Sequence, residues 1–148
     1  MTSPLKGLKG QRIALDTMIF IYAFEENPVY LPLLRPFFET VEKGELEATT
    51  STLTLTECLV QPYRKKDLML AARYIFLFRN FPHLTVFPVT DEIAERAAFL
   101  RAHYNLKTPD AVQLATGLFS ASNIFLTNDE ELPQVEGIQL FILDQHLK

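Results

Sequence analysis

The segment Arg12–Tyr22, with the sequence RIALDTMIFIY, constrains the fold more than any other part of the chain. A short apolar run ends at Asp16, and a longer run of large apolar residues begins at once. This pattern predicts a buried strand over 12–15 and a helix over 17–24, with Thr17 as the helix N-cap. In open α/β folds, ligands bind in the crevice outside the carboxyl ends of the strands. Asp16 is therefore either a structural cap or a functional group in such a crevice.

Beyond this segment, strand-like and helix-like apolar runs alternate. We expect further strands at 45–49, 84–89, 123–127 and 138–143, and helices at 31–43, 50–61, 67–81, 90–103 and 108–121. Pro62 is expected to end one helix, Thr90 and Thr108 to cap two others, and Pro88 to mark an edge strand. Strands separated by helices favour a parallel sheet with right-handed crossovers. The prediction is a three-layer α/β/α domain with a mainly parallel sheet of about five strands.

The size and composition of the chain limit its class. A length of 148 residues suits one domain over 1–148, with 1–11 as a loose N-terminal lead-in, and a hydrophobic fraction of 48% supplies a full core. A formal net charge of −4 argues against binding nucleic acid through the overall field, although a local basic strip remains compatible with it. The single cysteine, Cys58, can form no internal disulfide and is expected to be buried. Because no apolar run reaches about 18 residues and no signal peptide is evident, we expect a soluble cytoplasmic protein without a membrane span.

Four acidic residues lie beside apolar runs at the boundaries of predicted elements: Asp16, Glu57, Asp110 and Asp129. Each has a structural explanation when taken alone. Glu57 completes a capping box with Thr54, Asp110 favours the positive end of its helix, and Asp129 fits an ordinary turn. Taken together, the four explanations are less convincing, because all four positions fall at ends of strands or starts of helices.

In a parallel sheet, these element boundaries can meet at one edge, which would gather the four carboxylates in one cleft. Such a cluster is costly without a counter-ion, because like charges raise each other's pKa values. A hard divalent cation removes that cost, and magnesium prefers oxygen ligands while keeping several waters. The chemistry that matches such a site is metal-assisted hydrolysis of a phosphodiester bond.

Four segments, in this order, resemble the motifs of the PIN-domain ribonucleases, and most closely those of the VapC-type toxins of bacterial toxin–antitoxin pairs. The segments are LDTMIFIY at 15–22, TECLVQP at 56–62, TPDAVQLA at 108–115 and FLTND at 125–129. The resemblance spans roughly residues 12–143. It implies a sheet of about five parallel strands flanked by helices and an endoribonuclease that depends on Mg²⁺ or Mn²⁺. It also implies a homodimer and a groove in which a small antitoxin protein docks.

By this resemblance, Asp16 and Asp110 would be direct metal ligands. Glu57 and Asp129 would bind metal directly or through water, or hold the attacking water, and the number of ions stays open. Thr127 would support the fourth acid or a water on the metal. Many relatives carry an acid followed by Phe just after the fourth motif, whereas this chain has Glu130-Glu131-Leu132. Whether Glu131 shares the role of Asp129 is therefore open.

An acidic metal site repels phosphate, so substrate binding requires nearby cations. The densest basic group is 64–66 with Arg73 and Arg79, which is equally explained as a solvated helix–helix connection. The candidate substrate-binding residues closest to the predicted cleft are Thr17, Arg96, Arg101, Lys107 and Asn128.

Three alternative functions remain open at the level of sequence. A PIN-like module could bind RNA or protein without cutting it, although such a binder has no use for an intact acidic quartet. A haloacid dehalogenase-like phosphatase needs a second Asp two residues after its nucleophile, and that position is Met18 here. A metal-free ribonuclease with two catalytic histidines is poorly supported, because His83, His103 and His146 show no paired spacing.

Overall fold

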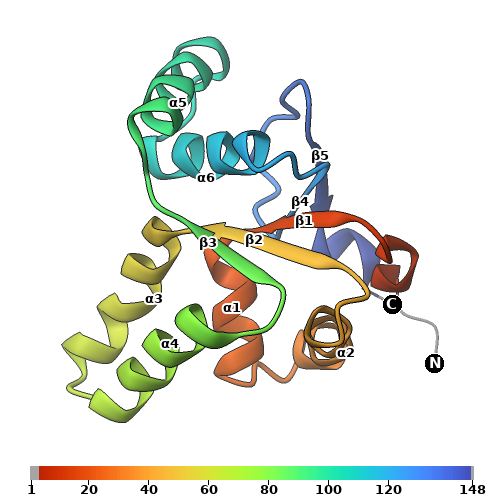
Figure 1. The fold of residues 1–148 in the computed structure, drawn as a ribbon, viewed down its shortest axis with the longest axis vertical. Coiled ribbons are helices and arrows are strands. Elements are labelled where there is room, and N and C mark those ends of the chain that lie inside the picture. The colour runs from red at the N-terminus through yellow and green to blue at the C-terminus, as the bar shows by residue number, and fades with distance from the viewer. Residues whose placement is uncertain (1–3, 148) are drawn as a thin grey trace.

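The computed structural model describes residues 4–147, apart from the side chains of Pro4 and Lys6; residues 1–3 and 148 of the predicted domain lie outside the described part. The elements, in chain order, are η1 (Pro4–Leu8), β1 (Arg12–Leu15), α1 (Thr17–Phe24), α2 (Leu31–Glu42), β2 (Glu47–Ser51), α3 (Thr52–Arg64), α4 (Leu68–Asn80), β3 (Leu84–Phe87), α5 (Asp91–Tyr104), α6 (Thr108–Phe119), β4 (Ile124–Thr127), β5 (Gln139–Ile142) and η2 (Leu143–His146). The alternation of strands and helices predicted from the sequence is therefore confirmed (Figure 1).

All five strands run parallel in one sheet, in the order β3-β2-β1-β4-β5. The chain builds outward from β1 through β2 to β3, and then returns to the other side of β1 to form β4 and β5. The junction of β1 and β4 is thus the topological switch point, where an open α/β sheet leaves a crevice. Leu15 pairs with Leu126 in this register, so Asp16 and Thr127 follow at the same edge of the sheet.

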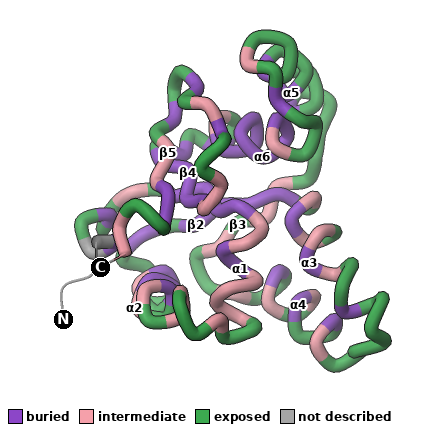
Figure 2. The backbone as a smooth tube through the Cα atoms, turned by 180° about the vertical axis from the view of Figure 1, so that it is seen from behind, coloured by how far each residue is buried: buried purple, intermediate pink, exposed green. Residues whose placement is uncertain are grey.

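Alternating side chains on the central strands feed two separate cores. Ile13 and Leu15 belong to the core that α1, α2, α3 and α4 cover, whereas Ala14 belongs to the core beneath α5 and α6. Figure 1 shows the two helical layers on opposite faces of the sheet, and Figure 2 shows that α6 is buried along most of its length. Gly117 permits this close packing, because a Cβ there would lie 3.2 Å from the Cβ of Ala14. The predicted three-layer α/β/α architecture is confirmed.

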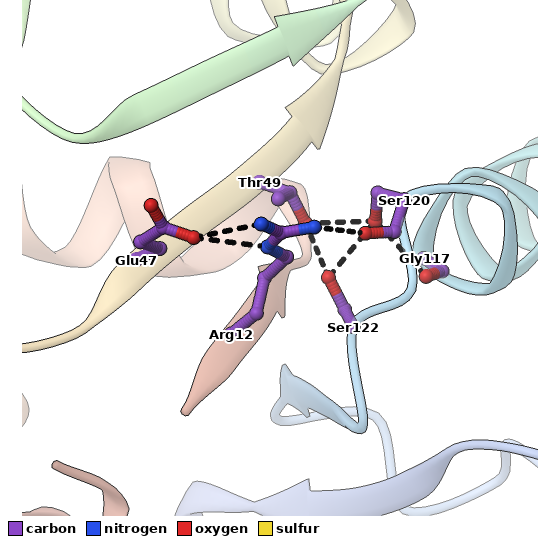
Figure 3. A network of polar contacts seen from close by, with 6 residues as sticks. All are labelled: Arg12, Glu47, Thr49, Gly117, Ser120 and Ser122. Carbon is purple, nitrogen blue, oxygen red and sulfur yellow. Dashed lines mark hydrogen bonds and ion pairs between the residues drawn. The ribbon is translucent and has the colours of Figure 1, made fainter. Parts of the chain in front are cut away.

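The opposite end of the sheet is closed by polar contacts, shown in Figure 3. The guanidinium of Arg12 donates to the Glu47 carboxylate, with a shortest distance of 2.9 Å, and to the Ser120 carbonyl at 2.8 Å. Beneath it, the buried hydroxyls of Thr49, Ser120 and Ser122 bond to one another. These contacts tie β1, β2 and the end of α6 together where the strands begin.

Two helix caps differ from the prediction, and one predicted capping box does not form. The cap of α1 is Asp16, not Thr17, and the N-cap position of α6 is Lys107, not Thr108. Ser51 caps α3 through a hydrogen bond to the Leu53 amide, so Thr54 lies inside the helix and the proposed capping box with Glu57 is wrong. In α1 and α6, the hydroxyl residue is already the first helical residue, so the residue before it takes the cap position. In α3, the cap lies three residues before Thr54. The prediction that Thr90 caps α5 is confirmed.

Other boundaries also shift. Pro62 lies within the last turn of α3 and does not end it; its ring is buried there, and only one backbone hydrogen bond is lost. Strand β2 extends to Ser51, two residues beyond the predicted end at 49, because Thr50 and Ser51 continue the buried strand. The part of the N-terminal lead-in that the structure describes is not loose, since η1 places Leu5 and Leu8 in the core. The edge position of β3 is confirmed, with Pro88 just beyond the strand.

Within residues 4–147, no helix combines the length and the apolar character that a membrane span requires.

Candidate active site

Asp16 occupies the switch point between β1 and β4. Its backbone N–H donates to the Leu126 carbonyl at 3.0 Å, which extends the β1–β4 pairing by one position. One carboxylate oxygen accepts the backbone N–H of Thr17 at 2.8 Å, and the other accepts the Thr127 hydroxyl at 2.7 Å. The residue is 7% exposed, so a carboxylate that caps a helix is also held in a largely desolvated position.

The fourth motif folds into a tight turn around Thr127, which is fully buried. While its hydroxyl donates to Asp16, its oxygen accepts the backbone N–H of Asp129 at 3.1 Å. One oxygen of Asp129 in turn accepts the backbone N–H of Glu131 at 2.9 Å. Thr127 therefore links the first and fourth acids of the predicted quartet directly, and the side chain of Glu131 stays exposed.

Glu57 reaches the same place from α3, one helical layer below the sheet. Its Oε1 accepts the hydroxyl of Thr17 at 2.5 Å, and Thr17 is the residue immediately after Asp16. The short distance is typical of a hydroxyl that donates to a charged carboxylate. Residues from the first and second motifs are thus in direct contact.

A further polar residue at the site, Gln113, was not singled out from the sequence. It lies on α6, one turn after Asp110, and is only 4% exposed. Its Nε2 donates to the hydroxyl oxygens of Thr17 at 3.1 Å and Thr54 at 2.6 Å. The available signal was a lone amide inside the apolar run AVQLA, where every neighbour is buried.

The four acids lie within electrostatic reach of one another. Burial raises the pKa of Asp16 from 3.8 to about 6; the hydrogen bonds from Thr127 and Thr17 lower it, and the charges of Asp110 and Glu57 raise it further. Burial also raises the pKa of Asp110, as do the charges of Asp129 and Glu57, whereas Lys107 lowers it. Each acid of the predicted quartet therefore either experiences or exerts a charge effect within this group.

The quartet does not form a closed coordination shell as the side chains stand. In the part of the chain that the structure describes, no three His, Cys, Asp or Glu side chains are arranged to hold one ion directly. Hydrogen bonds within the site occupy both oxygens of Asp16 and one oxygen each of Glu57 and Asp129. Charge effects connect the four carboxylates, and hydrogen bonds from the protein orient three of them, those of Asp16, Glu57 and Asp129.

The predicted substrate-binding cations lie on the α5–α6 side. Lys107 is exposed and near enough to Asp110 to affect its pKa. Arg101 donates to the Leu106 carbonyl at 3.1 Å and to the Thr108 hydroxyl at 3.3 Å, so it holds the turn before α6. Arg96 is exposed and has no hydrogen bond or ion pair from its side chain within residues 4–147.

Asn128 serves as a structural link beside the site. Its Nδ2 donates to the hydroxyl of Tyr30 at 2.9 Å, and its Oδ1 accepts the backbone N–H of Asp144 at 2.9 Å. The Tyr30 ring also stacks on Tyr22, with ring centroids 4.1 Å apart. Contact between Asn128 and a substrate would therefore require some of these bonds to break.

The other basic cluster is remote from the acids. Residues 64–66 lie at the far end of α3 from Ser51, which caps the end of that helix next to the site. Figure 1 shows the α3–α4 connection pointing away from the sheet.

Known proteins share this fold. A chain of VapBC2 from Rickettsia felis, solved with a DNA fragment from its promoter, aligns with a TM-score of 0.67 at 14% identity, over 88% of this chain and 98% of that chain. A chain of a toxin–antitoxin complex from Klebsiella pneumoniae aligns with a TM-score of 0.64 at 23% identity, over 85% and 94%. A chain of DNA-bound VapBC from Salmonella typhimurium aligns with a TM-score of 0.62 at 17% identity, over 89% and 98%. No curated protein matches the chain in sequence.

The family comparison agrees with the fold. The PIN domain model matches residues 13–138, which include β2, β3, β4 and all of β1 except its first residue, and which end directly before β5. All four segments that suggested the resemblance begin and end inside that range. The chain therefore belongs to the PIN domain family.

Proposed function

We propose that the protein is a metal-dependent endoribonuclease that hydrolyses RNA phosphodiester bonds, with Asp16, Glu57, Asp110 and Asp129 as its catalytic acids. The observation that supports this most strongly is the position of a desolvated carboxylate, Asp16, at the switch point of the sheet, where the charges of Asp110 and Glu57 act on it and the charge of Asp129 acts on Asp110. A cluster of this kind opposes folding unless a cation compensates it. Membership of the PIN domain family supports the same assignment.

The donor set fits a hard divalent cation, Mg²⁺ or Mn²⁺, because every candidate ligand is a carboxylate oxygen. Asp16 and Asp110 would hold the ion, and Glu57 and Asp129 would contact it directly or through water. Since the four acids do not converge on one point, water between some of them and the ion is the simplest arrangement. When bound, the ion would supply the positive charge that favours attack by water and stabilises the leaving oxygen.

The protein's own groups would perform the remaining tasks. Thr127 holds Asp16 and the turn that carries Asp129, so it would fix their separation. Lys107 and Arg96 would attract the RNA phosphates from the α5–α6 side, and Arg101 would hold the turn between these helices. Thr17 would contribute to substrate binding only with its oxygen, because its proton is directed to Glu57.

The test combines RNA cleavage with thermal unfolding. We expect wild-type protein to cut single-stranded RNA with Mg²⁺ or Mn²⁺ but not with EDTA, and Asp16→Asn/Asp110→Asn to be inactive. Metal should also raise the unfolding midpoint of the wild type but not of the double variant, because only the folded wild type offers the site. Asp91→Asn, an exposed acid on α5, should behave as wild type in both assays.

The second candidate function, an RNA- or protein-binding module without nuclease activity, makes a different prediction. In that case, RNA would bind without cleavage, and neither protein would gain stability at millimolar metal concentration. If metal changes the stability of neither protein, the nuclease assignment is wrong and the binding module is supported.

A role as a cytoplasmic toxin, neutralised by a small antitoxin protein, extends the proposal. Structural neighbours from K. pneumoniae and S. typhimurium are described as a toxin–antitoxin complex and as VapBC. An open apolar cleft of about 630 Å³, lined by Phe24, Leu70, Phe76, Leu77 and Phe81 among others, would accommodate an apolar segment of such a partner. Exposed apolar side chains on α3 and α4, including Tyr63, Leu68 and Met69, would support a homodimer.

These partner assignments have direct tests. A small open reading frame next to the gene should encode a protein that copurifies with this chain and relieves its toxicity on induction. Light scattering of the isolated chain should give the mass of a dimer. If induction of the protein does not inhibit growth, although the purified protein cleaves RNA, the toxin role is wrong and the nuclease assignment remains.

A further inference from the structure

A chain of buried polar groups runs behind the acidic site, from α6 to the sheet. Gln113 lies at its centre, with its amide nitrogen bonded to the hydroxyls of both Thr17 and Thr54. Thr54 is fully buried and also bonds to the hydroxyl of Thr50 at 2.9 Å. Beyond Thr17, the chain ends on the carboxylate of Glu57. One amide therefore connects three helices, α6, α1 and α3, at the base of the acids.

The directions of the protons that connect Gln113 to Glu57 follow from this arrangement. A charged carboxylate only accepts hydrogen bonds, so the single proton of the Thr17 hydroxyl must point to Glu57. The oxygen of Thr17 can then only accept, and the group that faces it from Gln113 must be an N–H. Its second N–H is directed to Thr54, which fixes the orientation of the amide. Gln113 thus ensures that the Thr17 proton has one acceptor available, namely Glu57.

The geometry points to Gln113 as a positioning residue for Glu57, acting through the Thr17 hydroxyl. This inference rests on the proposed function, since it concerns how one acid of the proposed metal site is held. Glu57 belongs to α3, whereas Asp16 precedes α1 and Asp110 lies on α6. Without Gln113, the Thr17 hydroxyl would lose the donor that orients it toward Glu57, and this polar connection from α6, which carries Asp110, to α1 and α3 would be lost. Partners that orient metal ligands in this way affect metal affinity strongly.

The test measures the dissociation constant of Mn²⁺ for the full chain by isothermal titration calorimetry. Gln113→Met keeps the volume and removes both N–H donors, and we expect it to weaken Mn²⁺ binding about tenfold. Gln113→Asn keeps the amide but shortens its reach, so it should also weaken Mn²⁺ binding. This variant provides the test if Gln113→Met does not fold. The matched control is Thr116→Val. It removes a different buried polar group on α6, a hydroxyl that donates to the Val112 carbonyl. We expect that control to bind Mn²⁺ as the wild type does.

A double-mutant cycle separates positioning from packing. Thr17→Val should weaken Mn²⁺ binding by itself, and Thr17→Ser, which keeps the hydroxyl, should restore it. Adding Gln113→Met to Thr17→Val should then change the affinity less than about twofold, because the path through the Thr17 hydroxyl is already broken. If Gln113 affects only packing, the effects of the two substitutions will multiply.

The outcomes distinguish this inference from the proposed function. Multiplying effects, or wild-type affinity in both Gln113 variants while Asp16→Asn loses binding, would overturn the role of Gln113 and leave the metal site intact. If the wild type itself binds no Mn²⁺ at millimolar concentration, the proposed metal site and the role of Gln113 fail together. If the losses of Mn²⁺ affinity from Gln113→Met and Thr17→Val do not multiply, and Thr116→Val binds Mn²⁺ normally, the proposed metal site and the role of Gln113 are both supported.

Discussion

In metal-free protein, the carboxylate of Asp16 should oppose folding at neutral pH, and Asp16→Asn should relieve that opposition. The pKa of Asp16 rises from 3.8 in the unfolded chain to about 6 in the folded protein, chiefly through burial. The folded state therefore holds a proton more tightly than the unfolded state. Stability from this group is fully present below pH 3.8, is lost as the pH rises through about 6, and is absent at higher pH.

The size of the effect follows from the change in pKa. A rise from 3.8 to about 6 corresponds to roughly 3 kcal/mol of unfolding free energy lost at neutral pH. An Asn at this position removes the charge but cannot accept the Thr127 hydroxyl in the same way, which costs about 1 kcal/mol at any pH. Asp16→Asn should therefore be less stable than wild type by about 1 kcal/mol at low pH, and more stable by about 2 kcal/mol above pH 7.

The measurement is urea unfolding, followed by circular dichroism in EDTA, of both proteins between pH 4 and pH 7.5. The difference between their unfolding free energies should move by roughly 2–3 kcal/mol in favour of the variant over this range. Using the difference cancels the titration of groups that the two proteins share. Asp91→Asn, which removes an exposed carboxylate from the first turn of α5, should show a difference that stays within about 1 kcal/mol. A pH-independent difference for Asp16→Asn would refute the claim that burial controls this carboxylate.

Three further predictions concern the helical layer of α3 and α4. Phe78→Ala should cost about 3–5 kcal/mol and Phe76→Ala less than about 0.5 kcal/mol in urea unfolding, because Phe78 is 6% exposed and Phe76 is 69% exposed; equal costs would contradict the packing described. Tyr74→Phe should cost about 1–3 kcal/mol, since the buried hydroxyl that donates to Glu25 at 2.6 Å is lost, and an unchanged midpoint would show that this bond contributes nothing. Cys58, whose thiol pKa is raised by burial, should resist a thiol reagent at pH 8 until urea unfolds the chain; rapid labelling of the native protein would show that α3 opens readily.

The sequence predicts the architecture well, because the spacing of apolar residues identifies the strands and helices and their order. The strand Arg12–Leu15 and the helix Thr17–Phe24 are confirmed with their predicted bounds, and the parallel sheet follows from strands that alternate with helices. The acids were identified by one criterion, their position at the boundary of apolar runs, and the structure gathers all four near the switch point. Boundary position can be read from the sequence because strand ends are local features, and a parallel sheet aligns them at one edge.

Details that depend on contacts between distant segments cannot be predicted from local sequence patterns. The choice of Asp16 over Thr17 as the cap of α1 depends on how β1 meets β4, more than a hundred residues along the chain. The partner of Glu57 is Thr17 on another helix, although the local pattern suggested Thr54. Gln113 is a similar case, since nothing in the run AVQLA indicates that its amide reaches two threonines on different helices.

These long-range contacts also hold three of the four acids in position. Thr127 holds Asp16 and Asp129, and Thr17 holds Glu57. Hydrogen bonds from uncharged hydroxyls and amides therefore offset part of the electrostatic repulsion between the carboxylates. The hydrogen bonds stabilise the ionised forms only in part, because the pKa of Asp16 still lies at about 6. A site built in this way keeps its carboxylates oriented while leaving charge uncompensated, and the uncompensated charge is what favours binding of a divalent cation. The same hydroxyls would therefore serve folding before metal binds and the precision of the site afterwards.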